Sequence, residues 1–202
     1  MPVTDESSIS SMASHLRHVY PNMQLRLALT LPGVLHVEKS PSQIDAVNAL
    51  QSFQVNALGP LLLMKHLAAF LPTKSSPPFE ETREDAFNLP SHAIYAMMAA
   101  RVGSISDNSS GGWYSYRASK ASVFQLAKTF DLHLRTRSRD RALAVALHPG
   151  TVKTDFTKEY WDGRDMLDPN EAAERLLGVL AAGIPVEKRG RCFDWKGEEV
   201  IP

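Results

Sequence analysis

Two residues of this chain, Tyr116 and Lys120, are spaced to move a proton. Residues four apart on a helix project from the same face, so the phenol and the ammonium are predicted to be neighbours. A free phenol keeps its proton up to about pH 10, and a nearby ammonium is expected to lower that pKa. Such a phenol can exchange a proton with a substrate oxygen, as a carbonyl requires when it accepts hydride. The alternative is a solvated helix face on which the lysine forms an ordinary salt bridge.

A second motif, His-Pro-Gly-Thr-Val-Lys-Thr-Asp, occupies residues 148–155. Pro149 and Gly150 follow a predicted buried strand, and parallel sheets bind ligands at the carboxyl ends of their strands. Glycine also lets the backbone approach a ligand closely. The alternative is an ordinary turn between a strand and a helix, but the spacing of the threonines favours a binding loop.

Asn56 precedes a predicted kink in a long helix. Pro60 has no backbone N–H, so it cannot donate the hydrogen bond that the carbonyl of Asn56 would otherwise accept. The freed carbonyl can hold a water molecule. The alternative is a kink that only fits the helix to a sheet.

Strand and helix patterns alternate along the chain. Two unbroken apolar runs, 93–100 and 142–147, are typical of parallel strands covered on both faces. The pattern predicts an α/β fold, a partial doubly wound, Rossmann-like parallel sheet with helices on both faces. The other predicted elements are a helix capped by Asp5, a strand at Leu25–Leu29, a helix from Ser42 to about Pro72, a helix from Trp113 to about Thr136, a helix from Glu171 to Leu180 capped by Asn170, and a strand at Arg191–Trp195.

Length and composition predict one domain, residues 1–202, because a chain of this size with 44% apolar residues can bury one substantial core. Residues 73–91 are polar and rich in proline, which predicts a surface loop. Acidic and basic residues are equal in number, so we expect neither nucleic acid nor a membrane as a partner, and a small molecule as the ligand.

The other site classes find little support in the sequence. The seven histidines show no paired spacing typical of zinc, so no metal is predicted. The single cysteine, Cys192, cannot form an internal disulfide, and the N-terminus shows no signal-peptide pattern. These features predict a cytoplasmic protein.

The sequence Gly-Trp-Tyr-Ser-Tyr-Arg-Ala-Ser-Lys-Ala at residues 112–121 resembles the active-site helix of the short-chain dehydrogenase/reductase family, in the variant of its C-factor-like and sniffer-like carbonyl reductases. Gln-Val-Asn-Ala-Leu-Gly-Pro at residues 54–60 resembles the asparagine segment of that family. Val-Thr-Asp at residues 3–5 resembles the tail of its adenine-side turn. The resemblance runs from the first residues of the chain to its end.

The resemblance implies an oxidoreductase that uses NADP, or NAD, to interconvert a carbonyl and an alcohol on a small molecule. It implies that Tyr116 is the general acid/base, that Lys120 tunes the pKa of the phenol and contacts the ribose, and that Asn56 holds a water in a proton relay.

The resemblance also implies a cofactor-binding loop and a mode of association. Val152 and Thr154 would contact the nicotinamide amide, and Pro149 and Gly150 would face its ring. A homodimer through the helix at residues 113–136 is a further implication.

Two departures from the family pattern bear on activity. The family carries a catalytic serine where this chain has Ala-Ala-Arg-Val-Gly, at residues 99–103. Ser104 and Ser106 follow closely, and either they replace that serine or they have ordinary loop roles.

Substrate choice is expected from the loop at residues 160–169, where Trp161 and Met166 suggest an apolar lid.

The second departure is the missing glycine-rich turn that holds the cofactor phosphates in the family. The chain is therefore predicted to be truncated at its N-terminus relative to the family, with the strand at Leu25–Leu29 as an unpaired edge. Leu31–Gly33 stands where the family has Asn-Ala-Gly. The alternative function is a non-catalytic truncated remnant or an interaction subunit of the same fold.

Overall fold

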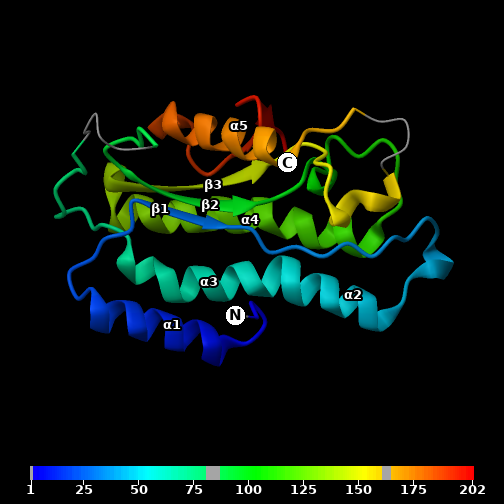
Figure 1. Ribbon diagram of the computed structural model, residues 1–202, viewed down its shortest axis with the longest axis horizontal. Helices are drawn as coiled ribbons and strands as arrows, with labels where there is room; N and C mark the ends of the chain where they lie inside the picture. Colours follow the sequence, from blue (N-terminus) through cyan, green and yellow to red (C-terminus); the bar gives the residue numbers. More distant parts are fainter. Residues whose placement is uncertain (1, 81–86, 161–164) are drawn as a thin grey trace.

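A single sheet lies between two layers of helices in the computed structural model, which describes residues 2–80, 87–160 and 165–202 (Figure 1). The strand order is β1-β2-β3-β4-β5, and β1 to β4 run parallel while β5 is antiparallel to β4. The strands are β1 (Leu27–Thr30), β2 (Ala93–Met98), β3 (Ala142–His148), β4 (Cys192–Asp194) and β5 (Glu199–Val200). The predicted α/β fold is thus confirmed, and β5 is an element that the sequence did not predict.

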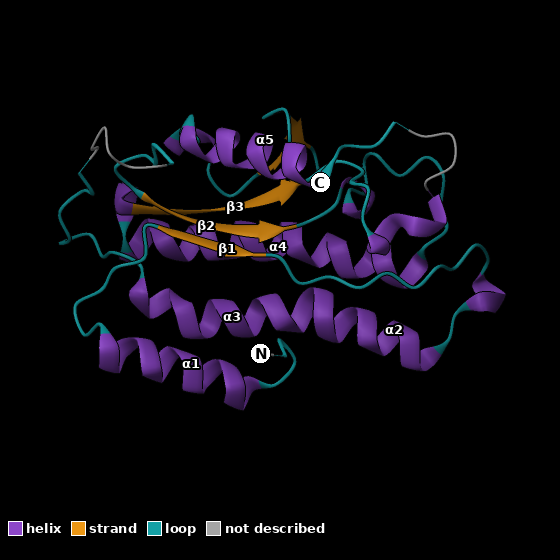
Figure 2. Cartoon of the chain, in the orientation of Figure 1, coloured by secondary structure: helices purple, strands orange, loops and turns teal. Residues whose placement is uncertain are grey.

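The helices divide unequally between the two faces of the sheet. Figure 2 shows α5 on one face, and α4 with α3, α2 and α1 on the other. The helices are α1 (Glu6–Val19), α2 (Ala46–Phe53), α3 (Gly59–Leu67), α4 (Tyr114–Arg137) and α5 (Pro169–Ala181). Short 3-10 turns occur at η1 (Pro41–Gln43), η3 (Ala68–Phe70), η4 (Arg101–Gly103), η5 (Arg139–Arg141), η6 (Asp155–Tyr160) and η7 (Val186–Lys188).

The core explains the two continuous apolar runs. Successive residues of a strand point to opposite faces. Tyr95 of β2 packs with Phe130 on the side of α4, and its neighbour Ile94 packs with Leu176 on the side of α5. Because both faces of β2 and β3 are covered, every position in these strands favours an apolar residue.

The long helix predicted from Ser42 is interrupted by a π turn, η2 (Gln54–Leu58), between α2 and α3. The N–H of Gly59 donates to the carbonyl of Gln54, five residues earlier. The turn lies directly before Pro60, whose missing N–H prevents the regular helical hydrogen bond. The predicted break in the helix is therefore confirmed, in the form of a π turn.

Helix caps were predicted with mixed success. Asp5 caps α1 by accepting from the N–H of Ser7. The prediction that Asn170 caps the last long helix is wrong, because Asp168 accepts from the N–H of Asn170 and caps α5. Pro169 occupies the first helical position, where a proline loses no hydrogen bond.

The predicted surface loop at residues 73–91 packs more closely than its composition suggests. Residues 81–86 lie outside the described residues. On the flanks, Ser76 and Leu89 are buried, and the N–H of Phe79 donates to the carbonyl of Ser91. These contacts close the N-terminal end of the sheet, away from the strand ends that bind ligands in parallel sheets.

Strand β1 lies at one edge of the described sheet. Among the described strands, β1 pairs with β2 alone. None of the helices in the described ranges combines the length and the apolar character that a membrane span requires.

Candidate active site

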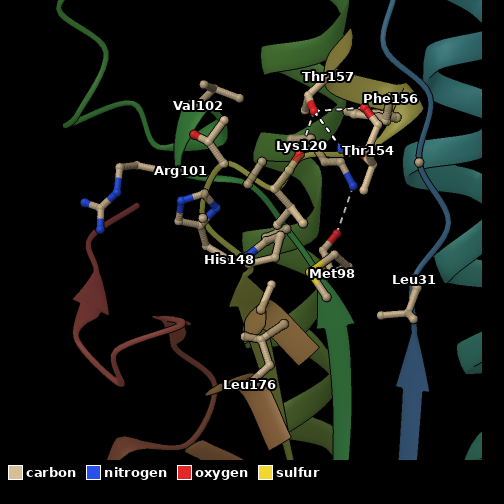
Figure 3. A pocket seen from close by; sticks show the side chains of 18 of the residues that line it. Leu31, Met98, Arg101, Val102, Lys120, His148, Thr154, Phe156, Thr157 and Leu176 are labelled. Carbon is tan, nitrogen blue, oxygen red and sulfur yellow. Dashed lines mark hydrogen bonds between the residues drawn. The ribbon is translucent and has the colours of Figure 1, made fainter. Parts of the chain in front are cut away.

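A cavity of about 570 Å³ opens where β1, β2 and β3 end (Figure 3). It is bounded by the segments that follow these strands, by the start of α4 and by α5. Six of the predicted site residues line it: Tyr116, Lys120, Pro149, Gly150, Val152 and Thr154. The fold therefore brings together two motifs that the sequence separates by a helix and a strand.

Lys120 is almost fully buried beside the cavity. Its ammonium donates to the carbonyl of Met98 at 2.9 Å (Figure 3) and, at 3.4 Å, to the carbonyl of Pro32. Burial lowers the pKa of Lys120 to about 8, because the charged form loses its water. The lysine thus holds the ends of β1 and β2 against α4.

Tyr116 is buried with its ring between two other aromatic rings. The Trp113 ring lies 6.1 Å from the Tyr116 ring at 74°, and the Phe156 ring lies 6.1 Å from it at 56°. The phenol oxygen has no hydrogen bond with any described residue, and burial raises the pKa of Tyr116 above its usual range. Burial outweighs the lowering of this pKa that Lys120 was expected to cause, because the ammonium is directed at backbone carbonyls.

Asn56 is not among the residues that line the cavity, and it holds together the segments around it. Its side-chain carbonyl accepts from the N–H of Val34, and its amide donates to the carbonyl of Val34 and to the hydroxyl of Ser119. Gly33, next to Val34, packs close to α4, since a Cβ at Gly33 would lie 3.4 Å from the Lys120 ammonium. The side chain of Asn56 therefore ties the segment after β1 to α4, and the relay role of its backbone carbonyl stays a prediction.

Gly150 allows a close packing contact at the edge of the cavity. Its φ is +80°, and a Cβ would lie 2.7 Å from the ring of Trp195 and 3.0 Å from Leu167. Only glycine meets both requirements at this position.

The variant Gly150→Ala should therefore destabilise the protein more than its backbone conformation alone explains. Gly197→Ala is the matched control, because Gly197 has the same φ of +80° and a Cβ there would make only an ordinary 3.7 Å contact. We expect about 1 kcal/mol of lost stability in the control and about 1 to 3 kcal/mol more in Gly150→Ala from overpacking. Urea unfolding of both variants measures the difference, and equal losses would contradict a packing role.

Ala99 and Ala100 both line the cavity, in the segment where the family carries its catalytic serine. Ser104 and Ser106 do not replace it. The hydroxyl of Ser104 donates to the carbonyl of Ile201 at 2.5 Å, and that of Ser106 donates to the carbonyl of Pro202 at 2.6 Å. Both serines therefore have the loop role that the sequence left open as the alternative.

His148 is a cavity residue that the sequence did not single out. Burial, followed by the nearby Arg101 charge, lowers its pKa to about 4, so its imidazole is neutral at pH 7. Its Nδ1 atom is buried without a hydrogen-bond partner among the described residues. Arg101 also lines the cavity, and its guanidinium donates to Asp194 at 2.9 Å. The position of His148 at the end of a buried strand is the sequence signal that could have predicted its place in the cavity.

The apolar lid predicted at residues 160–169 is only partly described by the structure. Trp161 lies outside the described residues, and Met166 is half-buried and is not a lining residue. Phe156 lines the cavity instead and had no signal in the sequence. Within the described ranges, no three histidine, cysteine or acidic residues are grouped so that they could hold a metal ion.

A parallel α/β sheet that brings a buried tyrosine and lysine to its ligand-binding edge defines a Rossmann-like oxidoreductase class. The chain is 30% identical over 175 residues to 1-hydroxy-2-glutathionyl-2-methyl-3-butene dehydrogenase of Rhodococcus sp. (strain AD45). This alignment covers 87% of the present chain and 67% of the dehydrogenase. The chain is also 31% identical over 157 residues to C-signal of Myxococcus xanthus. This alignment covers 78% of the present chain and 80% of C-signal. No family model matches the chain.

Solved structures agree with these relatives on the fold. Carbonyl reductase Sniffer of D. melanogaster matches with a TM-score of 0.83 and 19% identity, over 100% of this chain and 76% of that chain. The NADPH-bound carbonyl reductase from chicken fatty liver matches with a TM-score of 0.80 and 24% identity, over 99% of this chain and 75% of that chain. The chain belongs to the short-chain dehydrogenase/reductase family of oxidoreductases, in its C-factor-like and sniffer-like branch, as the motifs predicted.

Proposed function

We propose that this chain is a cytoplasmic oxidoreductase that interconverts a carbonyl and an alcohol on a small molecule, with NADP as its cofactor. The observation that carries the proposal is the shared cavity of Tyr116 and Lys120 with the loop from Pro149 to Thr154. The similarity to a dehydrogenase and the common fold with an NADPH-bound carbonyl reductase support it.

Tyr116 has the role of general acid/base in this proposal. Burial raises its pKa, so the phenol is protonated at neutral pH and can give its proton to the oxygen of a carbonyl that is being reduced. In the reverse direction the alcohol returns its proton to the phenolate. We assign the stabilisation of that phenolate to Lys120, a buried cation one turn further along the same face of α4, which offsets part of the cost of burial.

The residues around the cavity fit the nicotinamide end of the cofactor. Gly150, Val152 and Thr154 line the cavity, and Lys120 offers an ammonium for the ribose. When bound, the nicotinamide supplies or accepts the hydride. The sequence has no Gly-x-Gly-x-x-Gly turn, so these contacts are assigned to the nicotinamide and ribose alone, and NAD is the alternative cofactor.

Titration of the purified chain with NADPH, followed by fluorescence, tests the proposal. We expect saturable binding by the folded protein. Folded protein that shows no saturable binding would remove the oxidoreductase proposal and favour the non-catalytic interaction subunit, which the alanines at positions 99 and 100 also support.

We also propose a homodimer through the helix at residues 113–136, joined by the neighbouring α2. Val47, Leu50 and Phe53 are exposed on α2, and Leu132 is exposed on α4. Large apolar side chains exposed on a surface favour a protein interface. Sedimentation should show a dimer that Leu132→Glu converts to a monomer, and a monomeric wild type would overturn the proposal.

A further inference from the structure

Glu38, in the segment after β1, is buried and holds the start of α4. Its exposed fraction is 2%. One carboxylate oxygen accepts from the N–H of Ser115 at 2.7 Å, and its backbone carbonyl accepts from the N–H of Trp113 at 2.6 Å. The second carboxylate oxygen is buried and has no hydrogen-bond partner in the described part of the chain. A carboxyl group is costly to bury in this way, so its contacts with α4 need a reason.

The start of α4 has no cap of its own. Trp113 occupies the cap position with a φ of +51° and makes no side-chain cap hydrogen bond. Gly111 and Gly112 precede it with φ values of +63° and +68°, so three consecutive residues are left-handed. That conformation is strained for a tryptophan, because its Cβ crowds the following carbonyl oxygen. Glu38 supplies the missing cap from a distant segment, and a carboxylate also suits the positive end of the helix.

This anchor lies next to the reactive phenol. Tyr116 directly follows Ser115 and is the third residue of α4. The Trp113 ring, whose backbone Glu38 also holds, contacts the Tyr116 ring. The same segment of chain supplies the carbonyl of Pro32 that accepts from Lys120. The segment after β1 therefore holds α4 at two points, one on each side of the phenol.

We infer that Glu38 is a positioning residue, which fixes the Tyr116 phenol toward the cavity by capping α4 and by holding the left-handed turn at Trp113. The inference rests on the proposed role of Tyr116. Glu38 acts through the backbone of α4 and takes no part in proton transfer.

The variant Glu38→Ala tests the inference against a matched loss of a helix cap. Asp45→Ala is the control, because Asp45 caps α2 by accepting from the N–H groups of Val47 and Asn48. We expect kcat of Glu38→Ala to fall about 10- to 100-fold, since small misplacements of a reacting group have effects of this size. The NADPH Kd should stay within about twofold. Asp45→Ala should keep the kcat of the wild type.

Conservative variants separate positioning from general stability. Glu38→Gln keeps an oxygen acceptor at the same length and should recover most of the lost kcat. Glu38→Asp keeps the charge but is one methylene shorter, so its kcat should lie below that of Glu38→Gln. If Glu38→Ala does not fold, this pair carries the test. Wild-type kcat in Glu38→Asp, or equal kcat in Glu38→Ala and Asp45→Ala, would overturn the inference.

Hydrogen exchange gives a readout that does not depend on turnover. Glu38→Ala should speed the exchange of the Ser115 amide, which loses its side-chain acceptor, while Asp45→Ala should leave that exchange unchanged. A wild type without reductase activity would end the proposed function, and the exchange rates would still report the anchor. Unchanged exchange at the Ser115 amide would overturn the anchor itself.

Discussion

Tyr116→Phe should lower kcat by about 10²- to 10⁴-fold, which is the range that a general acid/base supplies. The phenylalanine keeps the ring between Trp113 and Phe156 and removes only the hydroxyl. NADPH affinity should therefore stay within about twofold of the wild type. The free energy of unfolding should change little, because the hydroxyl makes no hydrogen bond with the described residues. Steady-state oxidation of NADPH with a small ketone measures the loss.

Tyr114→Phe is the matched control for this prediction. Tyr114 lies on the same helix, two residues earlier, and its side chain is exposed to solvent. The same atom is removed in both variants, so only the place of the hydroxyl differs. Tyr114→Phe should keep wild-type turnover. Normal turnover in Tyr116→Phe would contradict the assignment of the acid/base.

The fold was predictable wherever a local pattern reflects burial. The runs at 93–100 and 142–147 became β2 and β3 because their residues pack against α4 on one face and α5 on the other. The strand β5 has only two residues, Glu199–Val200, which is too short for any periodicity. The cap of α5 was misplaced by two residues, because Asp168 and Asn170 are both good caps and only Pro169 between them decides which one precedes the helix.

The site was predictable where one motif holds the residues together. Tyr116 and Lys120 share a helix face, so their common cavity followed from spacing alone. Glu38 could not be predicted, because it reaches Ser115 across 77 residues of sequence. The pKa of Tyr116 is raised, whereas the spacing to Lys120 predicted that it would be lowered, and the reason is again tertiary. Its direction depends on burial by the rings of Trp113 and Phe156, whose positions are set by tertiary packing.

Lys120→Met should abolish most of the activity. The variant removes the ammonium that stabilises the phenolate of Tyr116 and that is assigned to the cofactor ribose. Loss of one charged donor at a reacting centre costs about 10²- to 10³-fold in kcat. NADPH should also bind more weakly, which distinguishes this variant from Tyr116→Phe. Lys128→Met, on the exposed side of the same helix, is the control and should keep both kcat and Kd.

Lys120→Met should have a higher free energy of unfolding than the wild type at pH 7 and a lower one at high pH. Burial lowers the pKa of Lys120 from 10.5 to about 8, so at pH 7 its charge costs the folded state about 3 kcal/mol. Methionine removes this cost but leaves the carbonyls of Met98 and Pro32 unpaired, at about 1 kcal/mol each, for a net gain of about 1 kcal/mol. Between pH 8 and 10.5 the unfolded wild type binds the proton that the folded wild type has released, so wild-type stability rises with pH relative to the variant. The raised pKa of Cys192 acts in the opposite direction, but it is common to both proteins and cancels in the difference. Urea unfolding of both proteins from pH 7 to 10.5 measures this difference, and a flat difference would show that Lys120 keeps its ordinary pKa.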